Sequence, residues 1–307
     1  MSQRMLHYGD YIAVIDTAHG ANCISLRNTR YNARILREPV APYGEWDNPY
    51  LYGMPLLFPV NRISGGCFFF EGREYRFPVN EPATGCHLHG TLHAAPFREL
   101  EHDERHTVCA FRAKAGEYLG FPHDFEVRLI YELSDGGLSV TAEVYNRSSL
   151  NMPVFLGFHT TFQTQFCAES RPDAVRARVA VAKEYERDMT TYLPTGKMPP
   201  PDEVTRALDA GRFVPIRTPI SRHYRAADGV MRLSDEDLGL SVVYESGENL
   251  PFRLIYCGGE AGSICLEPQT CLANCQNSPF SREENGFSHI APSECAVYRT
   301  KIYIEEN

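Results

Sequence analysis

The stretch FEVRLIYELSDGGLSVTAEVY, residues 125–145, contains the clearest fold signal in the chain. Its two arms, Phe125–Leu133 and Leu138–Tyr145, alternate apolar with polar residues and are rich in β-branched and aromatic side chains, as half-buried strands are. Ser134-Asp135-Gly136-Gly137 separates the arms, and Asp-Gly and Gly-Gly supply the positive φ angles of a tight turn. The stretch therefore predicts an antiparallel β-hairpin.

Similar strand patterns recur along the chain, separated by Gly, Pro, Asn or Asp residues. They are Tyr11–Asp16, Asn22–Arg27, Phe68–Phe70, Tyr75–Val79, Thr107–Ala113, Val154–Phe158, Val175–Val181, Leu240–Tyr244, Phe252–Tyr256, Ser263–Leu266 and Ala296–Ile304. Helix signals are sparse, and only Asp202–Ala210, with early acidic residues and a Gly immediately after it, predicts a short helix. We expect an all-β fold, a large antiparallel β-sandwich with one or two short helices. No stretch resembles an interdomain linker, so residues 1–307 are expected to form a single domain.

Charge and composition narrow the function. The net charge of −9 argues against a nucleic-acid or anionic-membrane surface, because such partners need a cationic stripe, and it favours a small-molecule partner. Residues 1–7 lack the apolar core of a signal peptide, and no run of about 18 apolar residues is present, which predicts a cytoplasmic protein outside the membrane. Most of the ten cysteines, such as Cys109, Cys167, Cys257 and Cys265, have apolar neighbours and are predicted to be reduced core thiols.

The segment from Pro59 to Gly90 is the first candidate site. It places Arg62, His87 and His89 near the ends of strands, with His93 close behind, where a sheet can hold them over a pocket. Taken singly, each has an ordinary interpretation as a surface ion pair or a hydrogen-bonded histidine. A metal site of the cupin kind is an alternative, because the two histidines of His-x-His can reach one ion. Cupin-like proteins usually have a Glu a few residues later, and its absence weakens this alternative without removing it.

Two further positions could carry chemistry. His159 follows the apolar run Val154–Phe158, and it is either a core histidine bound to a carbonyl oxygen or a pocket residue that Gly157 allows a ligand to approach. Glu267 ends the apolar strand Ser263–Leu266. A carboxylate there either has an ion-pair partner or lies in a low-dielectric pocket that raises its proton affinity, and we favour the second interpretation.

Four short motifs, Asn61-Arg62-Ile63, Leu88-His89-Gly90, Gly157-Phe158-His159 and Leu266-Glu267-Pro268, occur in this order along most of the chain. As an ordered set they resemble the aldose 1-epimerase (galactose mutarotase) family. The resemblance implies a β-sandwich of the "supersandwich" type that interconverts the α and β anomers of a monosaccharide and uses no cofactor and no metal. It also implies that Glu267 is the general base and His159 the general acid, and that His89 and Arg62 hold and polarise the substrate.

The reaction itself also asks for such residues. Opening a hemiacetal ring removes the proton on O1 and delivers one to the ring oxygen O5, so one acid and one base suffice. Two other function classes remain open, namely an idle sugar-binding protein on the same fold and a metal-dependent isomerase that uses His87, His89 and His93. The sequence does not specify an oligomeric state.

The chain also departs from the family pattern. Thr160-Thr161 replaces a Pro-Tyr that many members carry, which predicts a differently shaped wall beside His159. Ser221-Arg222-His223 aligns where an Asp commonly contacts a sugar hydroxyl. We therefore consider the hypothesis that Arg222, or else His223, faces the pocket, and that Arg222 favours an anionic sugar such as a phosphorylated, sulfonated or uronic one. The alternative is a surface arginine.

Overall fold

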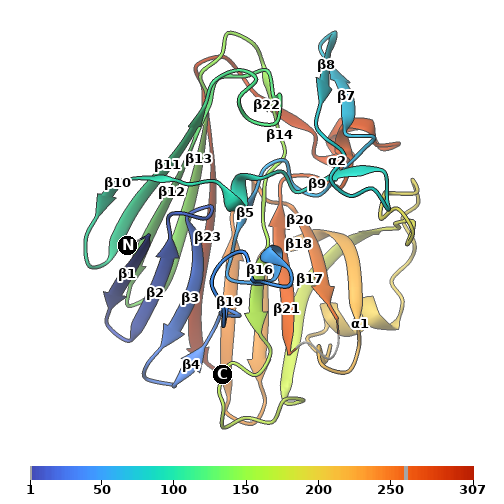
Figure 1. The fold of residues 1–307 in the computed structure, drawn as a ribbon. Helices are drawn as coiled ribbons and strands as arrows, with labels where there is room; N and C mark the ends of the chain where they lie inside the picture. The colour runs from blue at the N-terminus through green and yellow to red at the C-terminus, as the bar shows by residue number, and fades with distance from the viewer. Residues whose placement is uncertain (1, 259–261) are drawn as a thin grey trace.

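Antiparallel β-sheets make up most of the computed structural model, which describes residues 2–258 and 262–307 (Figure 1). The largest sheet contains, in spatial order, β10 (Arg98–His102), β11 (His106–Ala113), β12 (Phe125–Ser134), β13 (Gly137–Asn146), β23 (Cys295–Glu306), β19 (Leu240–Ser246), β18 (Ile220–Asp235), β20 (Phe252–Cys257), β21 (Ser263–Gln269), β15 (Gly157–Phe158) and β5 (Leu56–Leu57). In addition, β16 (Thr160–Gln163) pairs with β21 and β17 (Val175–Tyr185) pairs with β18. Because β23 pairs with both β13 and β19, it connects the two halves of this sheet.

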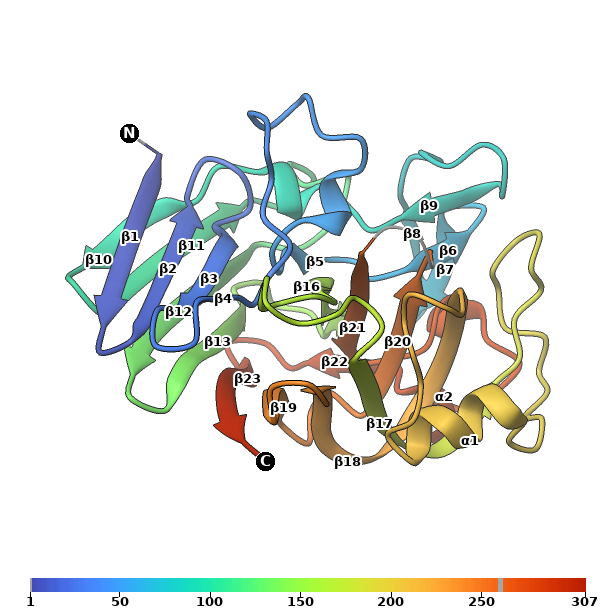
Figure 2. The same cartoon turned by 90° about the horizontal axis from the view of Figure 1, so that it is seen from below.

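A second sheet covers the first half of the large one (Figure 2). It consists of β1 (Gln3–Tyr8), β2 (Tyr11–Asp16), β3 (Asn22–Asn28) and β4 (Ala33–Arg34). The Tyr131 hydroxyl on β12 donates to the carbonyl oxygen of Ala21 at 2.6 Å and so ties the two layers together. The main cluster of buried apolar residues extends from Leu6 in this sheet to Leu266 on β21. Since one core spans both halves, we propose that the chain folds as a single domain.

Smaller elements lie along the top and the right side of Figure 1. Three two-stranded ribbons pair β6 (Arg62–Ser64) with β9 (Cys86–Leu88), β7 (Cys67–Phe70) with β8 (Arg73–Arg76), and β14 (Met152–Val154) with β22 (Ser288–Ile290). The two α-helices of the described residues are short, α1 (Glu203–Asp209) and α2 (Arg282–Asn285), and single 3-10 turns occur at Pro49–Leu51, Leu92–Ala94 and Cys275–Asn277. The predicted all-β sandwich with one or two short helices is confirmed.

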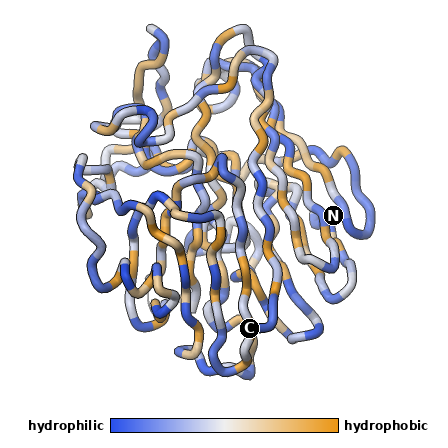
Figure 3. The backbone as a smooth tube through the Cα atoms, turned by 180° about the vertical axis from the view of Figure 1, so that it is seen from behind, coloured by the Kyte–Doolittle hydropathy of each residue, from blue (hydrophilic) through white to orange (hydrophobic). Residues whose placement is uncertain are grey.

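The alternation of apolar and polar residues that predicted the strands corresponds to an alternation of buried and more exposed side chains in the structure. Along β12 and β13 buried side chains alternate with more exposed ones, and the tube coloured by hydropathy shows the same alternation of apolar and polar residues (Figure 3). The turn between these strands depends on Gly137, whose φ of 96° favours glycine. The short helix was also predicted, and Asp202 caps α1 by accepting a 2.9 Å hydrogen bond from the backbone N–H of Thr205.

Two strand predictions need correction, and one long strand was missed. The strand expected over Tyr75–Val79 ends at Arg76, because Phe77 turns to donate to Gly66 and Pro78 has no N–H for a ladder. The run Val154–Phe158 is divided between β14 and β15, which pair with different partners. The long strand β18 was not predicted. Its first half pairs with β20 and its second half with β19, and the Ala-Ala-Asp-Gly stretch 226–229 between them interrupts the strand pattern.

The cysteines that were expected to be core thiols are buried. Cys109, Cys167 and Cys265 are free thiols in the core, and Cys257 is buried as well. Among the described residues, no helix is long and apolar enough to cross a membrane.

Candidate active site

A cavity of about 370 Å³ brings the four predicted site residues together. Glu267 reaches it from β21, Arg62 from β6, His89 from the end of β9, and His159 from the link between β15 and β16. The rest of the lining is Asn48, Tyr50, Leu51, Asn61, Glu81, Leu88, Arg187, Met189, Tyr192, Ser221, Leu254 and Tyr256. Positions from 48 to 267 therefore converge on one cavity.

Glu267 is a buried carboxyl with an unusual proton affinity. It lies opposite Leu254 across β20 and β21, and its side chain is 1% exposed. Burial raises its pKa from 4.5 to about 8, which outweighs the opposing effect of a 3.1 Å hydrogen bond that the Gln269 amide donates to Oε2. At neutral pH Glu267 therefore holds its proton, as the sequence hypothesis of a low-dielectric pocket expected.

His159 lies against this carboxyl. Its Nε2 is 3.3 Å from Glu267 Oε1, and burial lowers its pKa to about 4. Its backbone N–H donates to the Pro55 carbonyl oxygen at 3.0 Å, whereas its ring Nδ1 is buried without a hydrogen-bond partner among the described residues. The ordinary interpretation, a core histidine bound through its ring to a carbonyl, is therefore wrong. The two side chains are thus a carboxyl and an imidazole in contact, and because Glu267 has the higher pKa, the carboxyl carries the proton near neutral pH.

A chain of hydrogen bonds links Glu267 to His89, and two of its members, Asn61 and Gln269, were not assigned a role from the sequence. The backbone N–H of Asn61 donates to His89 Nδ1 at 3.2 Å, the Asn61 amide donates to Gln269 Oε1 at 3.3 Å, and Gln269 in turn donates to Glu267. Because Nδ1 of His89 accepts, its neutral ring carries the proton on Nε2 and can donate to a ligand. Asn61 has a positive φ of 62°, a conformation that Asn tolerates better than most residues. The Asn at this position is therefore the sequence feature that could have marked it.

Arg62 lines the cavity as predicted, but it already has a partner. Its Nε and Nη2 donate to the two carboxylate oxygens of Glu81 at 2.6 and 2.7 Å. The guanidinium also stands 4.4 Å from the centroid of the Tyr192 ring. This two-point ion pair fixes the orientation of the guanidinium at the cavity wall and neutralises its charge.

The hypothesis that Arg222 faces the cavity is wrong, and the alternative of an arginine outside the cavity holds. Successive residues of a strand point to opposite faces, and on β18 it is Ser221 that lines the cavity while Arg222 points away. The Arg222 guanidinium instead donates to both carboxylate oxygens of Asp202 at 2.8 and 2.7 Å and contacts Glu184 at 3.2 Å. His223 is completely buried and does not line the cavity either.

Two other expectations about the wall are also corrected. Thr160 and Thr161 are buried in the sheet and bond to Tyr244 at 2.8 Å and Cys265 at 3.3 Å, so they do not shape the wall. Gly157 is needed for packing and not for ligand approach. A Cβ added there would lie 2.8 Å from side-chain atoms of both Gln269 and Val60.

The alternative metal site does not assemble. His87 directs Nδ1 to the carbonyl oxygen of Pro78 at 2.7 Å, and within the described residues His87, His89 and His93 do not bring their ring nitrogens within 4.8 Å of one another. The one group of three that does gather in this part of the chain is His159, Cys265 and Glu267. Burial raises the pKa of the Cys265 thiol.

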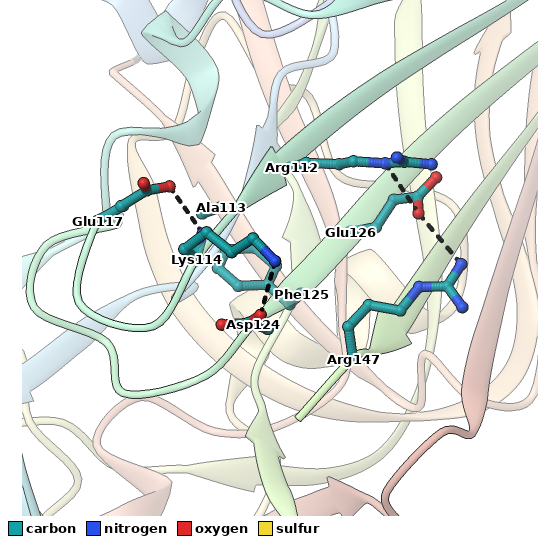
Figure 4. Close-up of a pocket in the computed structure, with 8 residues that line it drawn as sticks. All are labelled: Arg112, Ala113, Lys114, Glu117, Asp124, Phe125, Glu126 and Arg147. Atoms are coloured by element: carbon teal, nitrogen blue, oxygen red, sulfur yellow. Dashed lines mark hydrogen bonds and ion pairs between the residues drawn. The ribbon is translucent and has the colours of Figure 1, made fainter. Parts of the chain in front are cut away.

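A second hollow, of about 480 Å³, lies away from these residues on β11, β12 and the following turns (Figure 4). Its charged groups pair with one another: Arg112 and Arg147 each contact Glu126 at 3.1 Å, and Lys114 contacts Asp124 at 3.0 Å. With its charges neutralised, this hollow offers no group poised for proton transfer.

The sequence profile of the aldose 1-epimerase family matches residues 6–287, and the chain therefore belongs to this family. A galactose mutarotase-like protein from Clostridium acetobutylicum is similar in structure, with a TM-score of 0.92 and 28% identity, covering 99% of this chain and 95% of that one. Galactose 1-epimerase from Lactobacillus acidophilus NCFM shares the fold, with a TM-score of 0.74 and 15% identity over 99% and 94% of the two chains. By sequence, YphB of Escherichia coli K12, an uncharacterized protein, is 22% identical over 260 residues, which are 82% of this chain and 83% of YphB.

Proposed function

We propose that the protein is an aldose 1-epimerase that interconverts the α and β anomers of a monosaccharide by acid/base-catalysed ring opening and reclosure. The observation that supports this best is the contact between Glu267 and His159, a carboxyl and an imidazole 3.3 Å apart on the wall of one cavity. Family membership supports an isomerase-type enzyme, and the cavity has room for a monosaccharide.

Ring opening takes the proton from O1 and gives one to O5, and reclosure on the other face of the aldehyde reverses both transfers. In the roles that the family motifs imply, Glu267 accepts the O1 proton and His159 supplies the O5 proton. Before a sugar binds, the higher pKa of Glu267 keeps the proton on the carboxyl instead. A sugar hydroxyl that donates to the carboxylate lowers the pKa of Glu267, and the proton then crosses the 3.3 Å gap to His159 Nε2. The ion pair that results is the acid and the base that the reaction needs.

His89 and Arg62 act on the substrate and not on the proton balance. The Nε2–H of His89 points its hydrogen at a sugar oxygen, and the chain through Asn61 and Gln269 keeps it aligned with Glu267. Arg62, held by Glu81, donates from its remaining nitrogen. Such prepositioned donors stabilise charge that develops on the opening ring.

Polarimetry of freshly dissolved α-glucose and α-galactose, with and without the protein, tests the activity directly. We expect the approach to anomeric equilibrium to accelerate for a sugar that the cavity accepts. Binding without acceleration across a panel of hexoses and their charged derivatives would instead identify a sugar-binding protein.

The pH dependence of kcat/KM is expected to be bell-shaped, with limits near pH 4 and pH 8. Below pH 4 His159 is protonated together with Glu267, so that no base remains, and above pH 8 Glu267 is ionised beside a neutral His159, so that no acid remains. The two limits belong to the pair as a unit. Rates measured from pH 3.5 to 9.5, corrected for the uncatalysed reaction, check this, and a rate that keeps rising above pH 9 would contradict it.

We also propose that the protein works in the cytoplasm. Its core contains free thiols at Cys109, Cys167 and Cys265, and a reducing compartment preserves such thiols.

A further inference from the structure

Arg187 is a buried arginine on the wall of the active-site cavity, two residues beyond the end of β17. Its side chain is 7% exposed. Its Nη2 donates to the carbonyl oxygen of Ser221 at 2.5 Å and to the Ser221 hydroxyl at 2.8 Å. Throughout residues 2–258 and 262–307, no carboxylate oxygen lies within 4.0 Å of its guanidinium. A buried arginine without a carboxylate is uncommon, because an isolated buried charge is costly.

The other charges around the cavity are neutralised from within the protein. Arg62 is paired with Glu81, and Glu267 holds its proton at neutral pH. His89 and His159 are uncharged, because burial lowers the pKa of both rings. When Glu267 is protonated, Arg187 therefore carries the one positive charge of the cavity that lacks a paired carboxylate among the described residues; when Glu267 is ionised, its carboxylate attracts this guanidinium. The arginines of the hollow in Figure 4 differ in this respect, since both pair with Glu126.

Two contacts place this charge beside the ligand space. Tyr192, which also lines the cavity, lies between the two guanidiniums, 4.4 Å from that of Arg62 and 5.8 Å from that of Arg187. Burial, and then repulsion from Arg62, lower the pKa of Arg187 to about 10. The guanidinium nevertheless stays charged at neutral pH, and an anion in the cavity would relieve both of these effects.

We infer that the cavity binds an aldose that carries an anionic group, such as a phosphate, a sulfonate or a carboxylate, and that Arg187 binds this group. The inference rests on the proposed function of the cavity as a sugar site. A planar guanidinium donates two parallel hydrogen bonds to such oxyanions, and a neutral sugar offers no charge to match it. Arg222, which the sequence suggested for this role, is occupied by Asp202 and Glu184.

Calorimetric titration with methyl glycosides tests this, because a blocked O1 prevents ring opening and leaves binding alone to be measured. The probes are methyl α-D-glucopyranoside, its 6-phosphate, its 6-deoxy-6-sulfonate and methyl α-D-glucuronoside. We expect the wild type to bind at least one charged glycoside at least about tenfold more tightly than the neutral one, which corresponds to about 1.4 kcal/mol. The preferred probe distinguishes phosphate from sulfonate and carboxylate.

Arg187→Gln is expected to remove this preference, and Arg222→Gln, as the matched control, to keep it. Circular dichroism and the melting temperature verify that both variants fold. Equal affinity for charged and neutral glycosides in the wild type, or no binding of any charged probe, would overturn the inference. An equal loss of affinity for charged and neutral probes in Arg187→Gln would also overturn it, and would mean that Arg187 binds sugar hydroxyls or positions Glu267.

Anomer exchange of the corresponding free sugars separates this inference from the proposed function. A charged sugar that binds through Arg187 but does not exchange faster would refute the epimerase activity and leave the anion site intact. Accelerated exchange of neutral sugars with no preference for charged glycosides would refute the anion site and leave the epimerase activity intact.

Discussion

Glu267→Gln is expected to abolish catalysed anomer exchange and to make the fold more stable. Glutamine keeps the shape of the side chain, and its amide can donate one hydrogen bond as the protonated carboxyl does, but it cannot accept the O1 proton. The loss of a positioned base typically costs about 10²–10⁴-fold in rate. Polarimetry of the variant beside the wild type measures this loss. More than about a tenth of the wild-type rate would mean that another group is the base.

The gain in stability follows from the proton that Glu267 holds. The carboxyl has a pKa of about 8 in the folded protein and an ordinary value of 4.5. The folded state thus binds the proton more tightly, and the free energy of unfolding falls as the pH rises from 4.5 through 8. At pH 7 this difference in pKa lowers the free energy of unfolding by about 3 kcal/mol relative to a side chain that stays uncharged. Glu267→Gln removes it, so the variant should match the wild type near pH 4 and exceed it increasingly up to pH 8.

Denaturant unfolding of both proteins at several pH values measures this difference. Glu126→Gln is the matched control, because Glu126 is also a buried carboxyl but lies away from the cavity. There, against the effect of burial, hydrogen bonds from Arg128, Arg112 and Arg147 lower the pKa, and the substitution should reduce stability at neutral pH while activity persists. A Glu267→Gln protein no more stable than the wild type at pH 7 would show that Glu267 is ionised in the folded state.

His159→Gln is expected to reduce the catalysed rate by about 10²–10⁴-fold, because glutamine cannot pass a proton to the ring oxygen. The variant should still fold, since the backbone N–H of residue 159 keeps its bond to Pro55. The acidic limit near pH 4 should be replaced in any remaining activity by one set by the ionisation of Glu267, because without His159 the carboxyl must lose its own proton before it can act as the base.

His93→Gln controls for the removal of a buried imidazole. His93 is also buried, and burial lowers its pKa to about 4. Both His93 and His159 lie against the Tyr50 ring, with centroid distances of 4.7 and 6.0 Å. His93 does not line the cavity, so its substitution should leave the rate within a few-fold of the wild type. Equal losses in both variants would point to disturbed packing around Tyr50 instead of proton transfer.

The sequence was most informative where the pattern of apolar and polar residues along the chain follows directly from which side chains are buried in the fold. The arms of the hairpin around Gly137 alternate because one face is buried, so their register could be read directly. Arg62, His89, His159 and Glu267 could be proposed because each belongs to a short motif of the family pattern, and all four line the same cavity. Glu267 was expected just after its strand, but it lies inside β21.

The remaining parts of the site depend on geometry that a local pattern does not record. One residue of register on β18 decides that Ser221 faces the cavity and Arg222 faces Asp202. Arg187 lies outside any regular strand and pairs with Pro194 in an isolated bridge. Its importance comes from its place on the cavity wall without an ion-pair partner among the described residues, which only tertiary packing determines. Gln269 likewise acquires a role only through its contacts with Asn61 and Glu267.

The position of β23 has a consequence for synthesis on the ribosome. This strand follows every other strand in the chain, yet it lies in the interior of the large sheet, between β13 and β19. A nascent chain that has not yet released residues 295–306 leaves the edges of both neighbours open, and unpaired edges of this kind invite wrong partners. Folding of the whole sheet must therefore wait until translation has passed this strand, and a stop codon before residue 295 would separate the sheet into two halves with exposed edges.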